Sequence, residues 1–259
     1  MENTLDSKWA ADHGIDVTRM KKISPRTAEE VADAMKEIIR SGLFSVVVLD
    51  SIGAMVSKKA KEKDAEQAVM ADVAKIVTRM VQIAATEAPL TSTAVVIINQ
   101  VRANLSGYGS ETTTGGGWAL RHSSTMKFWL KRGKERFEDK IGGETVQVGH
   151  EIKVFMERNK VSPAYRTTSV NLFNRPSKWG PVGVDLPDEA FTLGVALGII
   201  AQEKATYVLP DESRHVGRPK TVEALRSRPD VVQLVRERVL SSTVVYEPQE
   251  EEGVVNVVD

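Results

Sequence analysis

The sequence of 259 residues has no cysteine, no excess charge of either sign and no long hydrophobic run. The absence of cysteine excludes disulfides and thiolate metal sites, which fits a reducing compartment. The 35 basic residues balance the 35 acidic residues, so any nucleic-acid binding must come from a local patch. Because no signal peptide and no apolar run of about 18 residues is recognisable, we expect a cytoplasmic protein without membrane contact.

The phosphate-binding motif G-x-x-x-x-G-K-S/T is also absent. The only Gly-Lys pair, Gly133-Lys134, lacks both the earlier glycine and the hydroxyl residue that the motif requires. The four histidines are scattered without the spacing of metal ligands, so a metal site built on them is not expected. The chain does contain enough apolar sequence, 41% of its residues, to bury one large domain and a small second one.

Helix and strand patterns alternate in the first hundred residues. Thr27 and Glu30 form a capping box at the start of an amphipathic helix expected over residues 27 to 40. Residues 45–50 and 94–100 are apolar on both faces, as is typical of buried parallel strands. A helix between them is indicated by apolar residues at helical spacing: Met70, Val73, Ile76, Val77, Met80 and Ile83. This order predicts a βαβ unit and an α/β fold.

Strand patterns dominate after residue 124. Residues 125–131, 146–158 and 164–173 are strand-like, and the last two are joined by a polar turn that predicts an antiparallel hairpin. The sheet is therefore expected to be mixed and mainly parallel. Short helices are indicated after residue 198, and much of the acidic end of the chain is expected to be disordered. The predicted parts are a core over residues 1–198, a small α/β domain over 199–242 and a tail over 243–259.

Polar residues close the two predicted parallel strands, at the place where α/β sheets bind ligands. Asp50 follows four apolar residues, as in the Walker B pattern whose carboxylate holds a nucleotide-bound Mg²⁺, and Ser51 could assist it. Gln100 ends the other strand, where an amide could sense a γ-phosphate. The alternatives are a turn cap for Asp50 and an ordinary strand-end hydrogen bond for Gln100. The stretch from Arg102 to Gly117 is too long and too rich in glycine for a simple connection.

Four segments stand in one order along the chain: SVVVLDS, INQVR, ETTTGG followed by WALRHSS, and MERNKVSPAYR. In this order and spacing they resemble the RecA recombinase family, and the resemblance runs from Glu2 to about Ser242. It implies a RecA-like ATPase core without its N-terminal strands, followed by a small α/β C-terminal domain. It further implies an ATP- and Mg²⁺-dependent protein that acts in DNA recombination, in DNA repair and in the response to DNA damage. Such a protein forms a homo-oligomeric filament on single-stranded DNA and exchanges strands with duplex DNA.

The resemblance also implies roles for individual residues. Glu2 corresponds to the catalytic glutamate that polarises water, and Gln100 to the residue that couples the nucleotide state to the DNA-binding loop. The nucleotide and its Mg²⁺ would be contacted by Asp50, Ser51, Asp6, Trp9, Arg158 and Lys160. Single-stranded DNA would be contacted by Lys75, Thr78, Arg102, Tyr108, Thr114, Gly115 and Gly116. Trp9 and Arg158 depart from the family pattern, which has tyrosine and lysine at these positions.

Several of these residues also have a simpler interpretation. Trp9 could be a core aromatic, and Arg158 and Lys160 could be the charges of a hairpin turn. The family's first DNA-binding loop would lie around Lys58 to Met70, where four lysines could instead form a solvated face: Lys58, Lys59, Lys61 and Lys63. Pro187 stands where the family places a further aromatic residue against the adenine, which favours a protein that does not hydrolyse nucleotide.

The missing phosphate cradle leads to two hypotheses about activity. In the P-loop, backbone amides and the lysine make most of the contacts that bind the phosphates. The chain alone is therefore predicted to bind ATP weakly or not at all. By the same argument it is predicted to be a weak or inactive DNA-dependent ATPase. A separate P-loop-bearing polypeptide could complete it, or the chain could be a fragment. The alternative is a non-hydrolysing DNA-binding or filament-modulating relative of RecA. A parallel sheet that lacks its neighbouring strands would expose apolar faces and unpaired edges to a partner chain.

Overall fold

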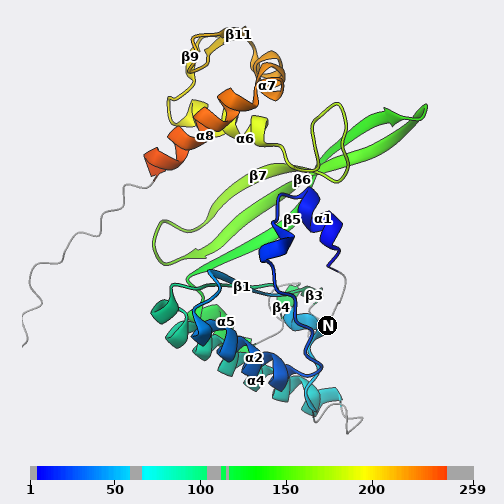
Figure 1. Cartoon of the computed structure of the whole chain (residues 1–259), viewed down its shortest axis with the longest axis vertical. Coiled ribbons are helices and arrows are strands. Elements are labelled where there is room, and N and C mark those ends of the chain that lie inside the picture. The colour runs from blue at the N-terminus through cyan, green and yellow to red at the C-terminus, as the bar shows by residue number, and fades with distance from the viewer. Residues whose placement is uncertain (1–4, 59–65, 104–111, 115–116, 244–259) are drawn as a thin grey trace, which may run out of the picture. The chain divides into compact units, whose positions relative to one another are not determined.

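The computed structural model of the chain describes residues 5–58, 66–103, 112–114 and 117–243 (Figure 1). The chain forms two compact units. Residues 1–128 and 156–165 make the first unit, and residues 129–155 and 166–259 make the second. Of the predicted tail, residues 244–259 lie outside the described residues.

Helices and strands alternate in the first unit. Its elements are α1 (Ser7–Asp12), η1 (Val17–Arg19), α2 (Ala28–Ser41), β1 (Val46–Leu49), η2 (Ile52–Ala54), α4 (Glu66–Glu87), η3 (Pro89–Thr91), β2 (Ala94–Ile97), β3 (Val101–Ala103), β4 (Thr112–Thr114) and α5 (Gly117–Ser123). β1 and β2 pair in parallel, with Val46 opposite Ala94 and Leu49 opposite Ile97. The predicted βαβ unit is confirmed, and α4 is the helix that connects its strands.

The ends of α2 lie where the capping residues predict them. Thr27 Oγ1 accepts a hydrogen bond from the N–H of Glu30 at 3.3 Å, and the Glu30 carboxylate accepts one from the N–H of Arg26 at 2.8 Å. After the last turn Gly42 adopts a left-handed φ of 64°, which residues with a Cβ rarely do. Local sequence therefore sets both ends of this helix.

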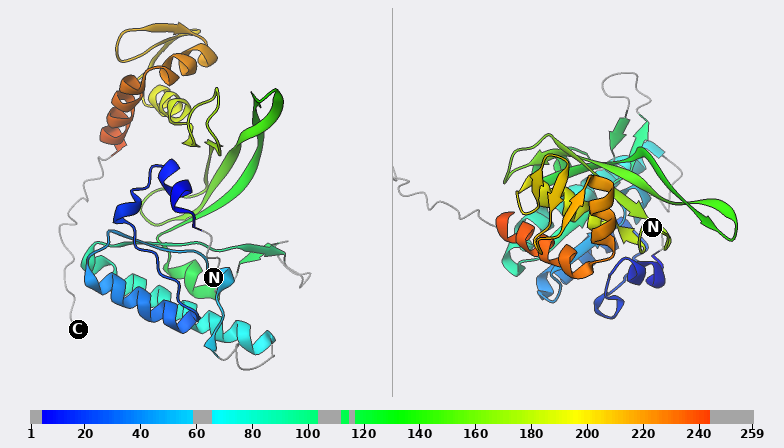
Figure 2. Two further views of the ribbon diagram at one scale, coloured as in Figure 1. Left: turned by 45° about the vertical axis from the view of Figure 1, so that its right-hand side comes forward. Right: turned by 90° about the horizontal axis from the view of Figure 1, so that it is seen from above.

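One face of the parallel strands is covered by helices. α2 and α4 lie side by side along β1 and β2 (Figures 1 and 2). Ile39 of α2, Val77 and Met80 of α4 and Leu49 of β1 are all buried in the shared core. The strand residues that alternate with the exposed ones pack against this core.

The other face of these strands is open. Val46, Val48 and Val96 are 54%, 56% and 47% exposed. The prediction that both strands are buried on both faces is therefore wrong for this face. Side chains alternate along a strand, so residues pointing away from α2 and α4 need a second covering layer, and the described residues do not bury them.

The second unit combines strands of a larger sheet with a helical C-terminal part. The elements from β5 onward, of which β5 and β6 have residues in both units, are β5 (Met126–Ile141), β6 (Glu144–Asn159), β7 (Arg166–Phe173), β8 (Gly183–Val184), α6 (Leu186–Ala196), β9 (Ala201–Glu203), β10 (Thr206–Val208), β11 (Arg214–Val216), α7 (Arg218–Arg226) and α8 (Pro229–Thr243). β5 to β8 lie in sequence order in one sheet, so β6 and β7 are neighbours, as the predicted hairpin requires. β1 and β2 pair in parallel, whereas β3–β4, β7–β8, β9–β10 and β10–β11 are antiparallel. The mixed α/β class is confirmed.

β5 is much longer than predicted, because it continues from the expected 125–131 to Ile141. Gly142 and Gly143 follow it with φ angles of 63° and 91°, as a two-residue hairpin turn requires, and β6 begins at Glu144. Phe137 anchors the added part of the strand, since its ring lies 5.3 Å from that of Phe173. The residues around Phe137 are mostly charged, so the sequence did not predict this part of β5.

The three last helices share a core of their own. Ala190 and Phe191 of α6 are buried with Leu225 of α7 and Val235 of α8. Helix α6 belongs to the predicted residues 1–198 and packs on helices of the predicted C-terminal domain, while the domain boundaries themselves stay a prediction. No helix in the described ranges is long and apolar enough to cross a bilayer.

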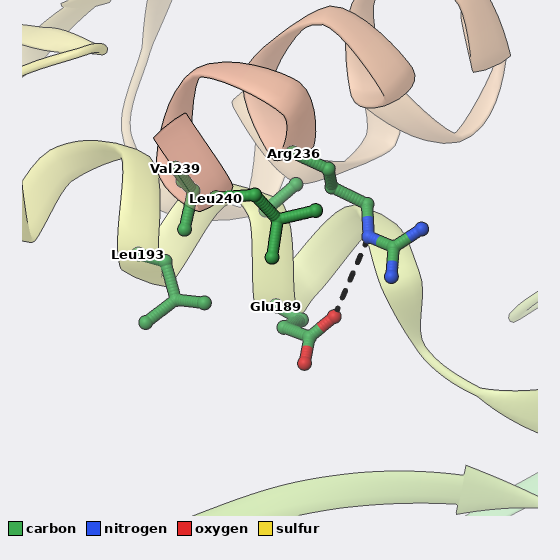
Figure 3. Close-up of a pocket in the computed structure, with 6 residues that line it drawn as sticks. Glu189, Leu193, Arg236, Val239 and Leu240 are labelled. Carbon is green, nitrogen blue, oxygen red and sulfur yellow. Dashed lines mark ion pairs between the residues drawn. The ribbon is translucent and has the colours of Figure 1, made fainter. Parts of the chain in front are cut away.

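A small hollow lies between α6 and α8 (Figure 3). Leu193, Val239 and Leu240 line it, and Glu189 pairs with Arg236 beside it at 3.7 Å. None of the residues predicted to bind nucleotide or DNA lines this hollow. It is therefore separate from the predicted site.

Candidate functional site

The parallel register of β1 and β2 brings their carboxyl ends to one edge of the sheet. The N–H of Ile98 donates to the Leu49 carbonyl at 2.9 Å, and the N–H of Ile52 donates to the Ile98 carbonyl at 3.1 Å. These bonds continue the pairing past the last strand residues. Asp50 and Gln100 follow the two strands and are both exposed at this edge, where open α/β sheets bind their ligands.

Asp50 and Ser51 supply oxygen atoms of the kind that Mg²⁺ prefers. Asp50 carries an exposed carboxylate, and the peptide bond between the two residues is cis. Ser51 is 1% exposed, and its Oγ finds no hydrogen-bond partner among the described residues. No three His, Cys, Asp or Glu side chains of the described ranges cluster as a metal site. These donors fit a Mg²⁺ held by one carboxylate together with water and phosphates, not an ion enclosed by protein.

The side chain of Gln100 lies against the backbone of η2. A Cβ atom on Gly53 would come within 3.0 Å of Gln100 Oε1 and 3.3 Å of Gln100 Cδ. Glycine at this position therefore lets the amide approach the segment that directly follows Asp50 and Ser51. The contact connects the ends of β1 and β2. The role of Gly53 could not be predicted from the sequence, because a single glycine after a strand resembles any turn residue.

Replacing Gly53 with alanine is expected to displace Gln100 and to leave the fold stable. The added Cβ meets the end of a flexible side chain, so the free energy of unfolding should change by less than about 1 kcal/mol. The side-chain amide resonance of Gln100, assigned by its loss in Gln100→Ala, should shift in an NMR spectrum of Gly53→Ala. Ala54→Gly alters the same turn without adding atoms and should not shift it. An unchanged resonance in Gly53→Ala would contradict the contact.

Asp6 and Trp9, the predicted adenine contacts, lie at the start of α1. Asp6 caps this helix, since its Oδ1 accepts a hydrogen bond from the N–H of Trp9 at 2.9 Å. The Trp9 ring lies 4.4 Å from that of His13 and the residue is 45% exposed. This exposure argues against the alternative of a core aromatic, and an accessible indole can stack on a base.

Arg158 and Lys160 converge on one main-chain oxygen. Arg158 Nη1 and Lys160 Nζ donate to the His122 carbonyl at 3.2 and 3.0 Å. His122 lies in the last turn of α5, where carbonyls lack partners within the helix and attract cations. The two predicted phosphate contacts therefore also fasten the helix that follows the predicted DNA-binding loop. Every residue has a main-chain carbonyl, so the sequence could not predict that the His122 carbonyl accepts these two hydrogen bonds.

The predicted DNA contacts are only partly described. Lys75 is exposed on α4, whereas Thr78 Oγ1 donates to the Ala74 carbonyl of the same helix at 2.9 Å. The side chains of Arg102 and Thr114 are not described, although their backbones are. Four predicted site residues lie outside the described residues altogether: Glu2, Tyr108, Gly115 and Gly116.

The segment from Arg102 to Gly117, predicted to be a loop throughout, begins and ends differently. Its first residues belong to β3 and pair antiparallel with β4, so that Arg102 lies opposite Thr113 and Ala103 opposite Thr112. The three consecutive threonines are β-branched and favour an extended backbone, which explains β4. The pairing of β3 with β4 brings the beginning of the segment close to the residues near its end. The segment begins at Arg102, two residues after Gln100.

This architecture is that of an α/β protein with a candidate ligand site at the carboxyl edge of a parallel βαβ unit. The family profile described as the RecA N-terminal domain matches residues 1–176, which is more than half of the chain. The chain therefore belongs to the RecA family. Every residue predicted to bind nucleotide or DNA lies within the matched part.

Proteins similar to this chain carry the name RecA. The chain is 28% identical over 256 residues to Protein RecA of Thermus aquaticus, a match that covers 97% of this chain and 72% of the relative. It is 27% identical over 256 residues to Protein RecA of Thermus thermophilus, with the same coverage. Protein RecA of Bacillus subtilis strain 168 is 25% identical over 257 residues, covering 97% of this chain and 71% of the relative.

Proposed function

We propose that the chain is a RecA-type DNA recombinase, which binds single-stranded DNA in an ATP-dependent manner and exchanges homologous strands in recombination and repair. Its P-loop comes from outside these 259 residues, since no phosphate-cradle motif occurs within them. The proposal rests on the placement of Asp50 and Gln100 at one edge, directly before the paired ends of the predicted DNA-binding segment. A chain that serves no nucleotide has no physical need for these groups together.

ATP and Mg²⁺ are the proposed cofactors. Asp50 with Ser51 would hold the ion, which neutralises phosphate charge when bound, and Trp9 would stack on the adenine. Arg158 and Lys160 would reach the phosphates of the neighbouring copy in a filament. They would exchange the His122 carbonyl for charged phosphate oxygens, which accept stronger hydrogen bonds from cations.

Glu2, which lies outside the described residues, is the proposed group that polarises the attacking water. Single-stranded DNA, duplex DNA and further copies of the chain are the proposed partners. The residues proposed to contact the DNA are Lys75, Thr78, Arg102, Tyr108 and Thr114, together with the backbone of Gly115 and Gly116. Backbone amides at glycine can approach phosphates without reading a base, so this binding would be independent of sequence.

Binding of single-stranded DNA tests the role of the glycines. Gly115→Val/Gly116→Val is expected to weaken binding about 10-fold, because two β-branched side chains keep the backbone from one or two phosphates. Fluorescence anisotropy with a labelled oligothymidylate over a salt series measures the change. The glycine amides carry no charge, so the variant should keep the slope of affinity against salt that the wild type shows.

The control adds two valines to an exposed strand of the second unit, as Ala201→Val/Gln202→Val, and should bind like the wild type. Wild-type affinity in the double glycine variant would remove this segment from the mechanism.

A second candidate function is a DNA-binding or filament-modulating protein that does not hydrolyse ATP. Pro187 favours it, because this residue lies in the first turn of α6, two residues after the cap Asp185, and offers no aromatic ring to an adenine. Proline suits the first turn of a helix, so the position has a structural use without nucleotide. DNA-stimulated ATP hydrolysis in the presence of a P-loop polypeptide separates the candidates, since the second predicts DNA binding and no hydrolysis.

A further inference from the structure

Trp9 and His13 lie four residues apart, Trp9 in the first turn of α1 and His13 directly after its last residue. Side chains at this spacing are neighbours on one face of a helix. Their ring centroids are 4.4 Å apart, and the ring planes are inclined by 52°. His13 is partly buried and Trp9 is 45% exposed, so the indole is covered on one side and accessible on another.

A hydrogen bond fixes the His13 ring in this place. Its Nδ1 atom lies 2.8 Å from the Trp9 carbonyl oxygen. A carbonyl oxygen only accepts, so Nδ1 carries the hydrogen and donates it, in the neutral and in the protonated imidazole alike. The ring that packs on the indole is therefore fastened to the main chain of the same tryptophan.

The short helix α1 holds the main chain of Trp9 but not its ring. Isolated helices shorter than about 12 residues are marginal in water, and α1 has six residues. Asp6 caps its start, and the N–H of His13 closes its end by donating to the carbonyls of Trp9 and Ala10 at 3.2 and 3.1 Å. Every residue except proline has such an N–H, so closing the helix does not require the imidazole. The imidazole instead restricts the torsions of the indole.

This restriction matters for a ligand that stacks on the indole. Flat rings attract one another in offset or edge-to-face arrangements, so stacking requires the indole in one orientation. An indole that turned freely would lose this freedom on binding. Immobilising one side chain at a binding surface corresponds to about 2- to 10-fold in affinity. Because the imidazole acts before any ligand binds, it removes most of this loss.

We propose that His13 is a positioning residue of the adenine site, which holds the indole of Trp9 in the orientation that stacks on the base. The imidazole packs on one side of the indole and leaves the accessible side to the adenine. The inference rests on the proposed function, in which Trp9 contacts the adenine. It adds a residue that acts through Trp9 and that has no contact with phosphate or metal to make.

Adenosine binding to the full chain tests the inference, because adenosine carries the base without the phosphates. His13→Ala is expected to raise the Kd for adenosine about 3- to 10-fold, since the indole loses the ring that orients it. Broadening of the adenosine H8 resonance in an NMR titration measures the Kd. The indole N–H resonance of Trp9, assigned by its loss in Trp9→Ala, should shift in His13→Ala before adenosine is added.

Two further variants separate orientation of the indole from stability of α1. His13→Phe keeps a ring against the indole and should bind adenosine within about 3-fold of the wild type. Lys8→Ala is the matched control, because it removes an exposed ion pair with Asp12 from the same helix. Alanine favours a helix, so this variant should keep the wild-type Kd and the wild-type indole resonance.

A double-mutant cycle decides whether His13 acts through Trp9. His13→Ala should add nothing to the loss in Trp9→Ala, because the indole it orients is gone. A further loss in the double variant, or a wild-type Kd in His13→Ala, would overturn the inference and leave the adenine contact of Trp9 in place. If the wild type does not bind adenosine, or Trp9→Ala binds it equally well, that adenine contact fails and the inference fails with it.

Discussion

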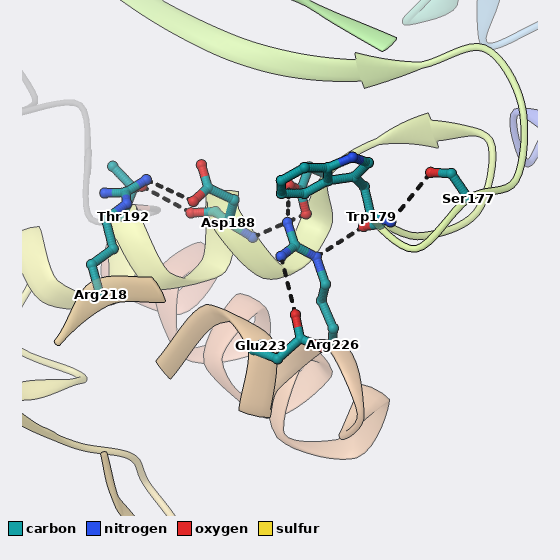
Figure 4. A network of polar contacts seen from close by, with 8 residues as sticks. Ser177, Trp179, Asp188, Thr192, Arg218, Glu223 and Arg226 are labelled. Carbon is teal, nitrogen blue, oxygen red and sulfur yellow. Dashed lines mark hydrogen bonds and ion pairs between the residues drawn. The ribbon is translucent and has the colours of Figure 1, made fainter. Parts of the chain in front are cut away.

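Replacing Arg226 with methionine is expected to lower the free energy of unfolding of the second unit by about 3 to 5 kcal/mol. Arg226 Nη2 contacts Asp185 Oδ2 at 2.6 Å, and Arg226 Nε donates to the Trp179 carbonyl at 2.8 Å (Figure 4). Asp185 is 3% exposed, and burial raises its pKa even with the guanidinium beside it. Removal of Arg226 leaves this buried carboxylate without an opposite charge, which accounts for the size of the loss.

The loss is expected to be larger at neutral than at acidic pH. Without Arg226, folded Asp185 keeps its proton to a higher pH than unfolded Asp185, because only the folded state buries the carboxyl group. Above the unfolded pKa the folded state therefore binds more protons, and stability falls as the pH rises. Urea unfolding followed by circular dichroism at about pH 4.5 and about pH 7 measures the difference from the wild type.

Two further variants separate burial from charge. Arg214→Met removes an exposed pair with Glu203 in the same unit and should cost less than about 1 kcal/mol. Asp185→Asn/Arg226→Met removes both charges and keeps an oxygen to cap α6, so it should recover more than half of the loss. If Arg226→Met were no less stable than Arg214→Met, the buried pair would have no special role.

The parts of the fold that follow from neighbouring residues could be predicted. The capping residues Thr27 and Gly42 set α2, and β-branched runs on either side of α4 set the parallel pair. The open face of that pair could not be predicted, because an apolar strand does not show whether a second layer covers it. The length of β5 depends on a contact between Phe137 and Phe173, which are far apart in the sequence. The local sequence around Phe137 is charged and therefore did not indicate a strand.

The candidate site shows the same division. The ends of two parallel strands always meet at one edge, so the sequence sufficed to place Asp50 and Gln100 together. The approach of Gln100 to Gly53 and the bonds to the His122 carbonyl depend on tertiary contacts with the main chain. The roles of Glu2 and Trp9 follow from family resemblance alone and stay predictions.

Replacing Asp50 with asparagine is expected to reduce DNA-stimulated ATP hydrolysis at least about 100-fold in the presence of a P-loop polypeptide. The amide cannot balance the charge of a bound Mg²⁺, and a metal that stabilises transferred phosphate contributes several kcal/mol to the reaction. Asp50 is exposed, so the free energy of unfolding should change by less than about 0.5 kcal/mol. A coupled ADP-release assay over a Mg²⁺ titration measures the loss.

Asp33→Asn is the matched control for this prediction. Asp33 is an exposed carboxylate of α2 that pairs with Arg79, so its replacement makes the same change of charge on an element that does not carry Asp50 or Gln100. Hydrolysis by this variant should equal that of the wild type, whereas equal activity of Asp50→Asn would make Asp50 a turn cap. Single-stranded DNA binding without nucleotide should survive in Asp50→Asn and weaken in Gly115→Val/Gly116→Val. This contrast assigns the nucleotide to the strand edge and the DNA to the segment that follows it.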